Sequence, residues 1–223
     1  MAIKSFKDKA TAAAFAELPV RSHPPEIRKR ALAKLQQLDV AMSLEDLRVP
    51  PSNRLEALAG DREGQHSIRI NKQWRRCFVF GKDGAEDVEI SKHYEGGGQP
   101  MSIRIEDLAK TDFRSVTVAG GKRIAPTSPG EMLREEFLKP MGLTNYRLAK
   151  EIDVPAQRIG DIIAGKRGIT ADTDLRLCRF FGLTDGWWLR LQGDYDTRLA
   201  RAALAKKLAK IKPWSTHLAA KAS

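Results

Sequence analysis

The chain has 223 residues, of which 42% are apolar and 30% are charged, so it can bury one or two hydrophobic cores and favours two modest domains. Its formal net charge of +11 favours a polyanionic partner, either nucleic acid or an anionic membrane surface. No apolar run approaches the roughly 18 to 20 residues that span a bilayer, and the first residues lack the core of a signal peptide. We therefore expect a cytoplasmic protein. A membrane partner is not expected, because the basic tail lacks a broad aromatic apolar face. The two cysteines, Cys77 and Cys178, are expected in different domains as reduced packing residues.

Residues 1–96 predict an α+β domain. An alanine-rich amphipathic helix follows a short apolar start, and Pro24-Pro25 introduces a second helix over 26–41 with one apolar stripe. After the turn VPPSN the helical period gives way to short runs typical of strands, in which apolar and polar residues alternate. These strands are predicted over 66–70, 74–80 and 85–91. Two helices followed by an antiparallel sheet are therefore expected.

Arginines gather on the predicted sheet. They are Arg62, Arg69, Arg75 and Arg76, with His66 among them and His93-Tyr94 after the last strand. Adjacent Arg75 and Arg76 must point to opposite faces, so only one of them can face a common site. A cationic cleft with a general acid or base suffices to cleave RNA, because the 2′-hydroxyl supplies the nucleophile. The alternative is a solvated sheet face. No metal-ligand spacing or phosphate-binding glycine loop is visible here, so no cofactor is expected.

The stretch EGGGQP at 95–100 matches neither helix nor strand, and Met101 follows at once. This pattern indicates a seam between two open reading frames, joined through a lost stop codon or deliberately. We expect the arm after Met101 to lie on the first domain or on a partner chain. The predicted parts are the α+β domain 1–96, the linker and arm 97–123, a helical domain 124–200 and a basic tail 201–223.

A helix-turn-helix is predicted over 144–166. Each of its helices has an apolar stripe, formed by Leu148, Ala149 and Ile152 and by Ile159, Ile162 and Ile163. Pro155 suits the first position of the second helix, and Gly165 can end that helix in a left-handed conformation. Such segments also occur as plain packing units, so the neighbouring helices matter for the interpretation.

Helix-starting signals flank this motif on both sides. Ser128-Pro129-Gly130-Glu131 is a capping box, Thr170 caps a later helix, and Thr184-Asp185 starts another that carries Trp187 and Trp188. Five short helices therefore predict an all-α domain. We expect both tryptophans in its core or at a dimer interface rather than in a ligand site.

The second helix of the motif has Gln and Arg side chains facing outward, and these read adenine and guanine edges in a major groove. We expect DNA contacts from Thr144, Arg147, Ala156, Gln157, Arg158, Asp161 and Lys166. Most of the basic surplus lies on this side of the seam, with a net charge of +8 after residue 100 against +3 before it. The tail could add salt-sensitive phosphate contacts, or it could be a frayed, solvated end.

The segment GDREGQHSIRIN, followed by QWR, resembles the compact HigB toxins of the RelE superfamily, and the likeness extends over nearly all of residues 1–96. The resemblance implies a ribosome-dependent endoribonuclease that cuts mRNA in the decoding site. It also implies a role for each matching residue. Arg62 and Arg69 would hold the RNA backbone, Arg75 would stabilise the transition state, and His93 with Tyr94 would supply the acid–base and stacking groups.

This chain departs from the family pattern at two places. Many members end in Asp-Tyr-His, whereas this chain has Lys92-His93-Tyr94. The frequent His and Lys before GDR are replaced by Glu56 and Ala59. Several side chains are therefore candidates for proton transfer, and cleavage is expected to be weaker or to depend more on ribosomal groups.

The later stretches PGEMLREEF, RLAKEI, PAQRIGDIIAGKRGIT and WWLRLQGDYD resemble the HigA-type antitoxins of the Xre-like helix-turn-helix family. Together the two resemblances imply a toxin–antitoxin fusion. Its expected partners are operator DNA, the ribosome with mRNA, and a second copy of the chain bound through the helix-turn-helix domain. In that dimer the two recognition helices would lie about one DNA turn apart. The alternative is a transcriptional regulator whose first domain is inactive and serves for dimerisation or sensing.

Overall fold

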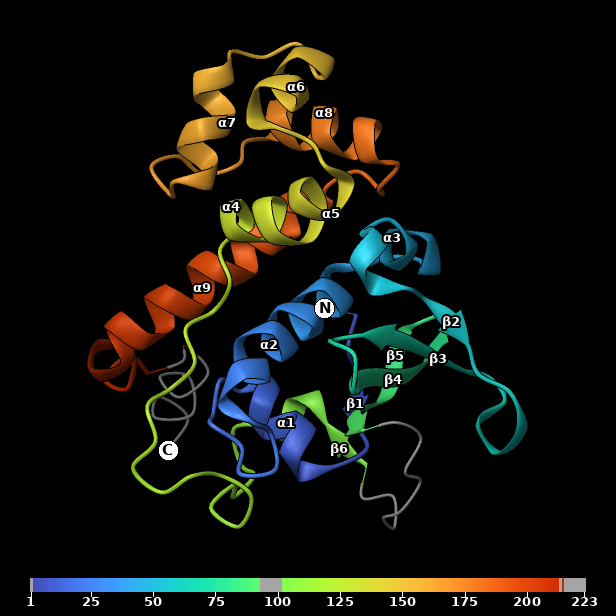
Figure 1. Cartoon of the computed structure of the whole chain (residues 1–223). Helices are drawn as coiled ribbons and strands as arrows, with labels where there is room; N and C mark the ends of the chain where they lie inside the picture. Colours follow the sequence, from blue (N-terminus) through green and yellow to red (C-terminus); the bar gives the residue numbers. More distant parts are fainter. Residues whose placement is uncertain (1, 93–101, 213, 215–223) are drawn as a thin grey trace.

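The N-terminal domain begins with a short strand and two helices. The computed structural model describes residues 2–92, 102–212 and 214 (Figure 1). The first elements are β1 (Ser5–Phe6), α1 (Lys9–Phe15) and α2 (Pro25–Val40). Asp8 starts α1 because its carboxylate accepts the backbone N–H of Thr11. Pro25 suits the start of α2, where no backbone donor is needed.

A six-stranded sheet completes this domain in the order β2-β3-β4-β5-β1-β6. Its remaining strands are β2 (Glu56–Ala57), β3 (Gln65–Arg69), β4 (Trp74–Gly81), β5 (Gly84–Lys92) and β6 (Ile103–Arg104). The strands β3 to β5 form the expected antiparallel meander, and β2, which we did not predict, pairs antiparallel with β3. However, β1 pairs with β5 in parallel. The predicted α+β class is confirmed, and the parallel pair of β1 with β5 makes the sheet a mixed one.

Short helical segments connect α2 to the meander. They are α3 (Leu44–Arg48) and the 3-10 turns η1 (Pro51–Asn53) and η2 (Gly60–Arg62). Ser43 caps α3 by accepting the backbone N–H of Asp46. We did not predict α3, since a helix of five residues is too short to show an apolar period.

The arm after the linker lies on the N-terminal domain of its own chain. Its strand β6 pairs antiparallel with β1, and a 3-10 turn, η3 (Ile105–Asp107), follows. Phe113 is buried in the hydrophobic core of this domain. Further on, Val118 donates its backbone N–H to the carbonyl of Pro19 at 2.8 Å. The arm therefore supplies both an edge strand and a core side chain to the first domain.

His23 makes the stability of this domain depend on pH. Its ring is buried at 5.6 Å from the ring of Trp74, and burial lowers its pKa from 6.5 to about 4. Between these values the unfolded chain binds a proton that the folded chain does not, so stability falls as pH drops from 6.5 to 4. The expected loss is at most about 3 kcal/mol.

Urea unfolding of the full chain at several pH values tests this expectation. The variant His23→Gln should lose less stability than the wild type between pH 6.5 and 4, because glutamine does not titrate. Identical pH dependence of the two proteins would contradict the role of His23.

The second domain is helical. Its elements are α4 (Pro129–Met132), the π-helical turn η4 (Leu133–Leu138), α5 (Lys139–Met141), α6 (Asn145–Glu151), α7 (Ala156–Ile163), α8 (Ala171–Phe181) and α9 (Trp187–Leu208). Ser128 caps α4 through the backbone N–H of Glu131, as the capping box predicts. The wider π turn ends two residues before Pro140, whose ring would meet the carbonyl of Glu136 in a regular α-helix.

Aromatic side chains fill the core of the helical domain. Trp187 and Trp188 are fully buried and pack on Phe137, with ring centroids at 5.7 and 4.9 Å. This confirms the core alternative for both tryptophans. Gly130 lets α4 approach α7 closely, because a Cβ there would collide with the carbonyl oxygen of Ile162.

The last helix differs from its prediction. We expected five short helices ending near residue 200, but α9 has 22 residues and continues to Leu208. Its later turns are exposed and rich in lysine and alanine, which are good helix formers. Figure 1 shows α9 running from the helix-turn-helix towards the N-terminal domain, where it contacts α2. In the described part of the chain, no helix has the length and apolarity that a bilayer crossing requires.

The two domains pack through α2. Ala33 and Val40 of this helix belong to the hydrophobic core of the helical domain. Beside them, Lys34 Nζ donates to Glu136 Oε2 of η4 at 2.5 Å, and Ser52 Oγ donates to the same oxygen at 2.6 Å. The Lys34 side chain is fully buried.

The protonation of this junction follows from its geometry. Burial alone would raise the pKa of Glu136, but the Lys34 ammonium and the Ser52 hydroxyl hold that pKa below its ordinary value. The carboxylate therefore stays charged at neutral pH. This buried ion pair connects α2 of the first domain with η4 of the second.

Candidate functional site

Strand register brings the arginines of the N-terminal domain onto one sheet face. Arg69 of β3 lies directly opposite Arg75 of β4, and Arg75 lies opposite Ser91 of β5. Paired residues of an antiparallel sheet share a face, so these side chains form one row. Arg76 points the other way, opposite Ile68, into the core.

Acidic side chains of the same domain pair with two of these arginines. Arg75 Nη1 donates to Glu56 Oε2 at 2.7 Å and to Ser67 Oγ at 2.9 Å. Arg62 of η2 joins this row, since it forms an ion pair with Glu89 of β5 and its Nη1 donates to Cys77 Sγ of β4, and both partners lie on the face of Arg75. These pairs hold both guanidinium groups in place over the sheet. Phosphate oxygens could replace the carboxylates there, since they make the same charge-assisted hydrogen bonds.

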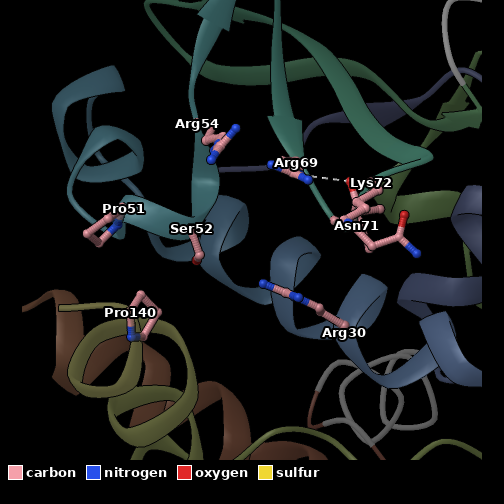
Figure 2. A pocket seen from close by; sticks show the side chains of 9 residues that line it. Arg30, Pro51, Ser52, Arg54, Arg69, Asn71, Lys72 and Pro140 are labelled. Atoms are coloured by element: carbon pink, nitrogen blue, oxygen red, sulfur yellow. Dashed lines mark hydrogen bonds between the residues drawn. The ribbon is translucent and has the colours of Figure 1, made fainter. Parts of the chain in front are cut away.

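Arg69 differs from the other two arginines of the row. Its Nε donates to the backbone oxygen of Asn71 at 3.0 Å, and it has no carboxylate partner among the described residues. Figure 2 shows its side chain at the edge of a pocket, next to Arg54 and Asn71. The structure therefore brings the three predicted arginines to one face of the sheet, with Arg69 at one end of the row.

The structure describes only some of the candidate groups for proton transfer. His66 lies opposite Phe78 and stacks on its ring, with the ring centroids 6.1 Å apart. It therefore belongs to the core face of the sheet and not to the arginine row. His93 and Tyr94 lie outside the described residues. The strand that leads to them, β5, ends at Lys92, whose strand partner is Trp74. The described part of β5 thus extends one residue beyond the pair of Arg75 and Ser91.

Arg76 is a buried arginine without a hydrogen-bond partner among the described residues. Its guanidinium lies 5.3 Å from the ring centroid of Phe78. Complete burial lowers its pKa to about 9, so it remains charged at neutral pH. The ring face of Phe78 compensates part of this charge.

A pocket of about 460 Å³ opens where the two domains meet (Figure 2). Its lining comes from α2, η1, the end of β3 and α5. The residues are Arg30, Pro51, Ser52, Arg54, Arg69, Ile70, Asn71, Lys72 and Pro140. Sequence analysis missed Arg30, Arg54 and Lys72, because they are distant from one another in the chain. Among the described residues, no cluster of three His, Cys, Asp or Glu side chains could hold a metal ion.

The helix-turn-helix is formed by α6 and α7, at the end of the molecule far from the sheet (Figure 1). Thr144 caps α6 by accepting the backbone N–H of Arg147 at 3.1 Å. Gly165 ends the second helix with φ +69°, as predicted. Pro155 precedes α7 as its N-cap and does not occupy its first position.

The predicted DNA contacts have different exposures. Thr144, Arg147, Ala156, Gln157 and Lys166 are exposed, whereas Arg158 and Asp161 are half-buried. Gln157 Nε2 donates to Asp161 Oδ1 at 2.7 Å. Arg158 Nη1 donates to Asp172 Oδ2 of α8 at 2.5 Å. Gln157 is thus held on the outer surface of α7, and Arg158 also ties α7 to α8.

Comparison with known proteins agrees with this division of the chain. Residues 4–93 match the RelE-like toxin of the type II toxin–antitoxin system HigB. Residues 135–188 match a helix-turn-helix family. The class is therefore a toxin–antitoxin protein that carries both components in one polypeptide.

Individual relatives make the assignment more specific. Virulence-associated protein I of Dichelobacter nodosus is 49% identical over 86 residues, which cover 38% of this chain and 80% of that protein. Toxin HigB-1 of Vibrio cholerae is 47% identical over 70 residues, which cover 31% of this chain and 74% of that protein. Antitoxin HigA-1 of Vibrio cholerae is 34% identical over 88 residues, which cover 40% of this chain and 83% of that protein. The chain belongs to the HigB toxin family in its N-terminal domain and to the HigA antitoxin family in its C-terminal domain.

One solved structure shows what a relative binds. The Pseudomonas aeruginosa antitoxin HigA, solved with the higBA promoter, is 38% identical, covers 39% of this chain and 95% of that chain, and has a TM-score of 0.37.

Proposed function

We propose that the N-terminal domain is a metal-independent endoribonuclease that cuts mRNA on the ribosome. The observation that carries this proposal is the row of arginines over the sheet, with Arg69 directly opposite Arg75. In this role Arg62 and Arg69 hold the RNA backbone, and Arg75 stabilises the charge on the phosphorane. His93 moves the proton and Tyr94 stacks on a base.

The attached helical domain inhibits this nuclease in cis. It packs on α2, while the acidic partners of Arg62 and Arg75 belong to the N-terminal domain itself. Inhibition therefore does not require a side chain to cover these two arginines. The bulk of the helical domain keeps the nuclease out of the narrow decoding site of the ribosome.

Growth of bacteria that express parts of the chain tests both proposals. Residues 1–124 keep the arm with β6 and Phe113, and so the complete core of the N-terminal domain. Their expression should arrest growth, whereas the full chain should not. Harmless expression of residues 1–124, shown to be folded by circular dichroism, would contradict the nuclease assignment.

The helical domain also binds operator DNA as a dimer and represses its own promoter. This proposal is supported by the exposed outer surface of α7 and by the family match of residues 135–188. Gln157 is the exposed side chain best suited to read a base edge. In a two-fold dimer the two copies of α7 would lie about one DNA turn apart.

Replacing Gln157 with alanine tests this role. We expect operator affinity to fall about 5- to 100-fold while affinity for random DNA stays the same, because a base contact adds only to specific binding. The matched control is Lys166→Ala, which removes an exposed lysine just beyond the end of α7 and should weaken binding to both DNAs alike, as loss of a phosphate contact does. Competition gel shifts at fixed salt measure the affinity of each variant for operator DNA and for random DNA. An equal loss of affinity on both DNAs for Gln157→Ala would contradict base reading.

A second candidate function is a transcriptional regulator with an inactive first domain. It is favoured by the carboxylates of Glu56 and Glu89, which neutralise two arginines of the row. Operator binding by the full chain together with harmless residues 1–124 would establish this alternative.

A further inference from the structure

The pocket at the domain junction has cationic side chains from four separate segments. Arg30 comes from α2, Arg54 follows η1, Arg69 ends β3, and Lys72 lies in the turn before β4. The described lining contains no carboxylate. Arg30, Arg54 and Lys72 are exposed and Arg69 is half-buried, so an anion in the pocket can reach all four charges.

Pairing within the protein leaves part of this charge uncompensated. Arg30 Nε lies 3.5 Å from Glu136 Oε1, a carboxylate that it shares with Lys34. Arg69 reaches only a backbone oxygen, and Arg54 has no acidic partner among the described residues. In the arginine row, by contrast, Glu56 and Glu89 supply carboxylates. The pocket therefore attracts an anion more strongly than the row does.

The backbone aims Arg54 at this pocket. Its φ of +44° is left-handed, a conformation that costs a non-glycine residue about 1 kcal/mol or more. The preceding turn is held by Asn53, which is buried and donates to the carbonyl of Leu47 at 2.7 Å. Figure 2 shows the guanidinium of Arg54 directed towards Arg69.

The other end of the pocket is less polar. Pro51 of η1 and Pro140 of α5 lie there, away from Asn71 and Lys72 (Figure 2). A volume of about 460 Å³ is in the range of small-ligand sites. The apolar ring of a proline can pack against a base or ribose, and guanidinium groups bind phosphate in a bidentate manner.

We propose that this junction pocket binds one nucleotide, with its phosphate between Arg54 and Arg69 and its base or ribose against Pro51 and Pro140. The nucleotide is either a free nucleoside monophosphate or one unit of an RNA chain, since both present the same phosphate. Because Pro140 belongs to the helical domain, the complete site exists only when the domains are packed. Bound nucleotide therefore stabilises the packed arrangement.

Calorimetric titration of the full chain tests the pocket without any cleavage. The probes are adenosine 5′-monophosphate and a 2′-O-methyl RNA trinucleotide, which lacks the 2′-hydroxyl needed for cleavage. We expect Arg54→Gln to weaken binding about tenfold or more, because charge-assisted hydrogen bonds are lost. The matched control is Arg104→Gln, which removes the same charge from an arginine that is exposed on β6, and it should bind as the wild type does.

The outcomes separate the sources and decide the proposal. Arg54-dependent binding of the monophosphate supports the pocket as a free-nucleotide site. Arg54-dependent binding of the trinucleotide alone supports it as a position on an RNA track. Absence of binding, or equal binding by the Arg54→Gln and Arg104→Gln variants, would overturn it. Failure of the nuclease proposal leaves this test intact, because neither probe is cleaved.

Discussion

Replacing Arg75 with alanine should lower mRNA cleavage by residues 1–124 about 100- to 1000-fold. This is the typical cost of removing one group that stabilises developing charge in the transition state. The side chain of Arg75 lies on the outer face of the sheet and is 20% exposed, and its ion-pair partner Glu56 is 47% exposed. Glu56 can therefore be solvated after the substitution, so we expect the domain to keep its fold.

The measurement is the rate of cleavage in a purified ribosomal translation system, with circular dichroism as the test of folding. The matched control is Arg104→Ala, which removes an exposed arginine of the edge strand β6 and should leave the rate unchanged. A folded Arg75→Ala protein with the wild-type rate would remove Arg75 from the mechanism.

Replacing Glu136 with lysine should separate the two domains of the full chain. The new ammonium would lie beside Lys34, which is fully buried, and beside Arg30. Loss of one member of a buried ion pair typically costs about 3–5 kcal/mol, and a like charge in its place adds repulsion. We therefore expect faster hydrogen exchange along α2 and the appearance of nuclease activity in the full chain.

Two controls make this experiment specific. Glu135→Lys changes charge by the same amount one residue away, but its side chain is 36% exposed and it should have little effect. The exchange of both charges, Lys34→Glu with Glu136→Lys, should restore part of the packing. Unchanged exchange along α2 in Glu136→Lys would show that this ion pair does not hold the domains together.

Local patterns account for most of what the sequence predicted. The two-residue alternation of Ile68 and Ile70 with polar neighbours predicted a strand, and both side chains are buried in the core. The capping box at Ser128 predicted the start of α4, which begins at Pro129. By contrast, β1 has two residues and leaves no detectable period.

The candidate site was only partly predictable for the same reason. Alternation required Arg75 and Arg76 to face opposite sides, but it did not say which of them faces the core. The apolar neighbours Trp74 and Phe78, which share the face of Arg76, were an unused signal. No local pattern could assemble the junction pocket, because Arg30, Arg69 and Pro140 meet there only after the domains pack.

The central claim is that one chain carries a ribosome-dependent nuclease and its own inhibitor. The most direct test is translation in a purified ribosomal system with the mRNA ends mapped, comparing residues 1–124 with the full chain. We predict cleavage by residues 1–124 and none by the full chain. Cleavage by both proteins would contradict inhibition in cis, and cleavage by neither would contradict the nuclease itself.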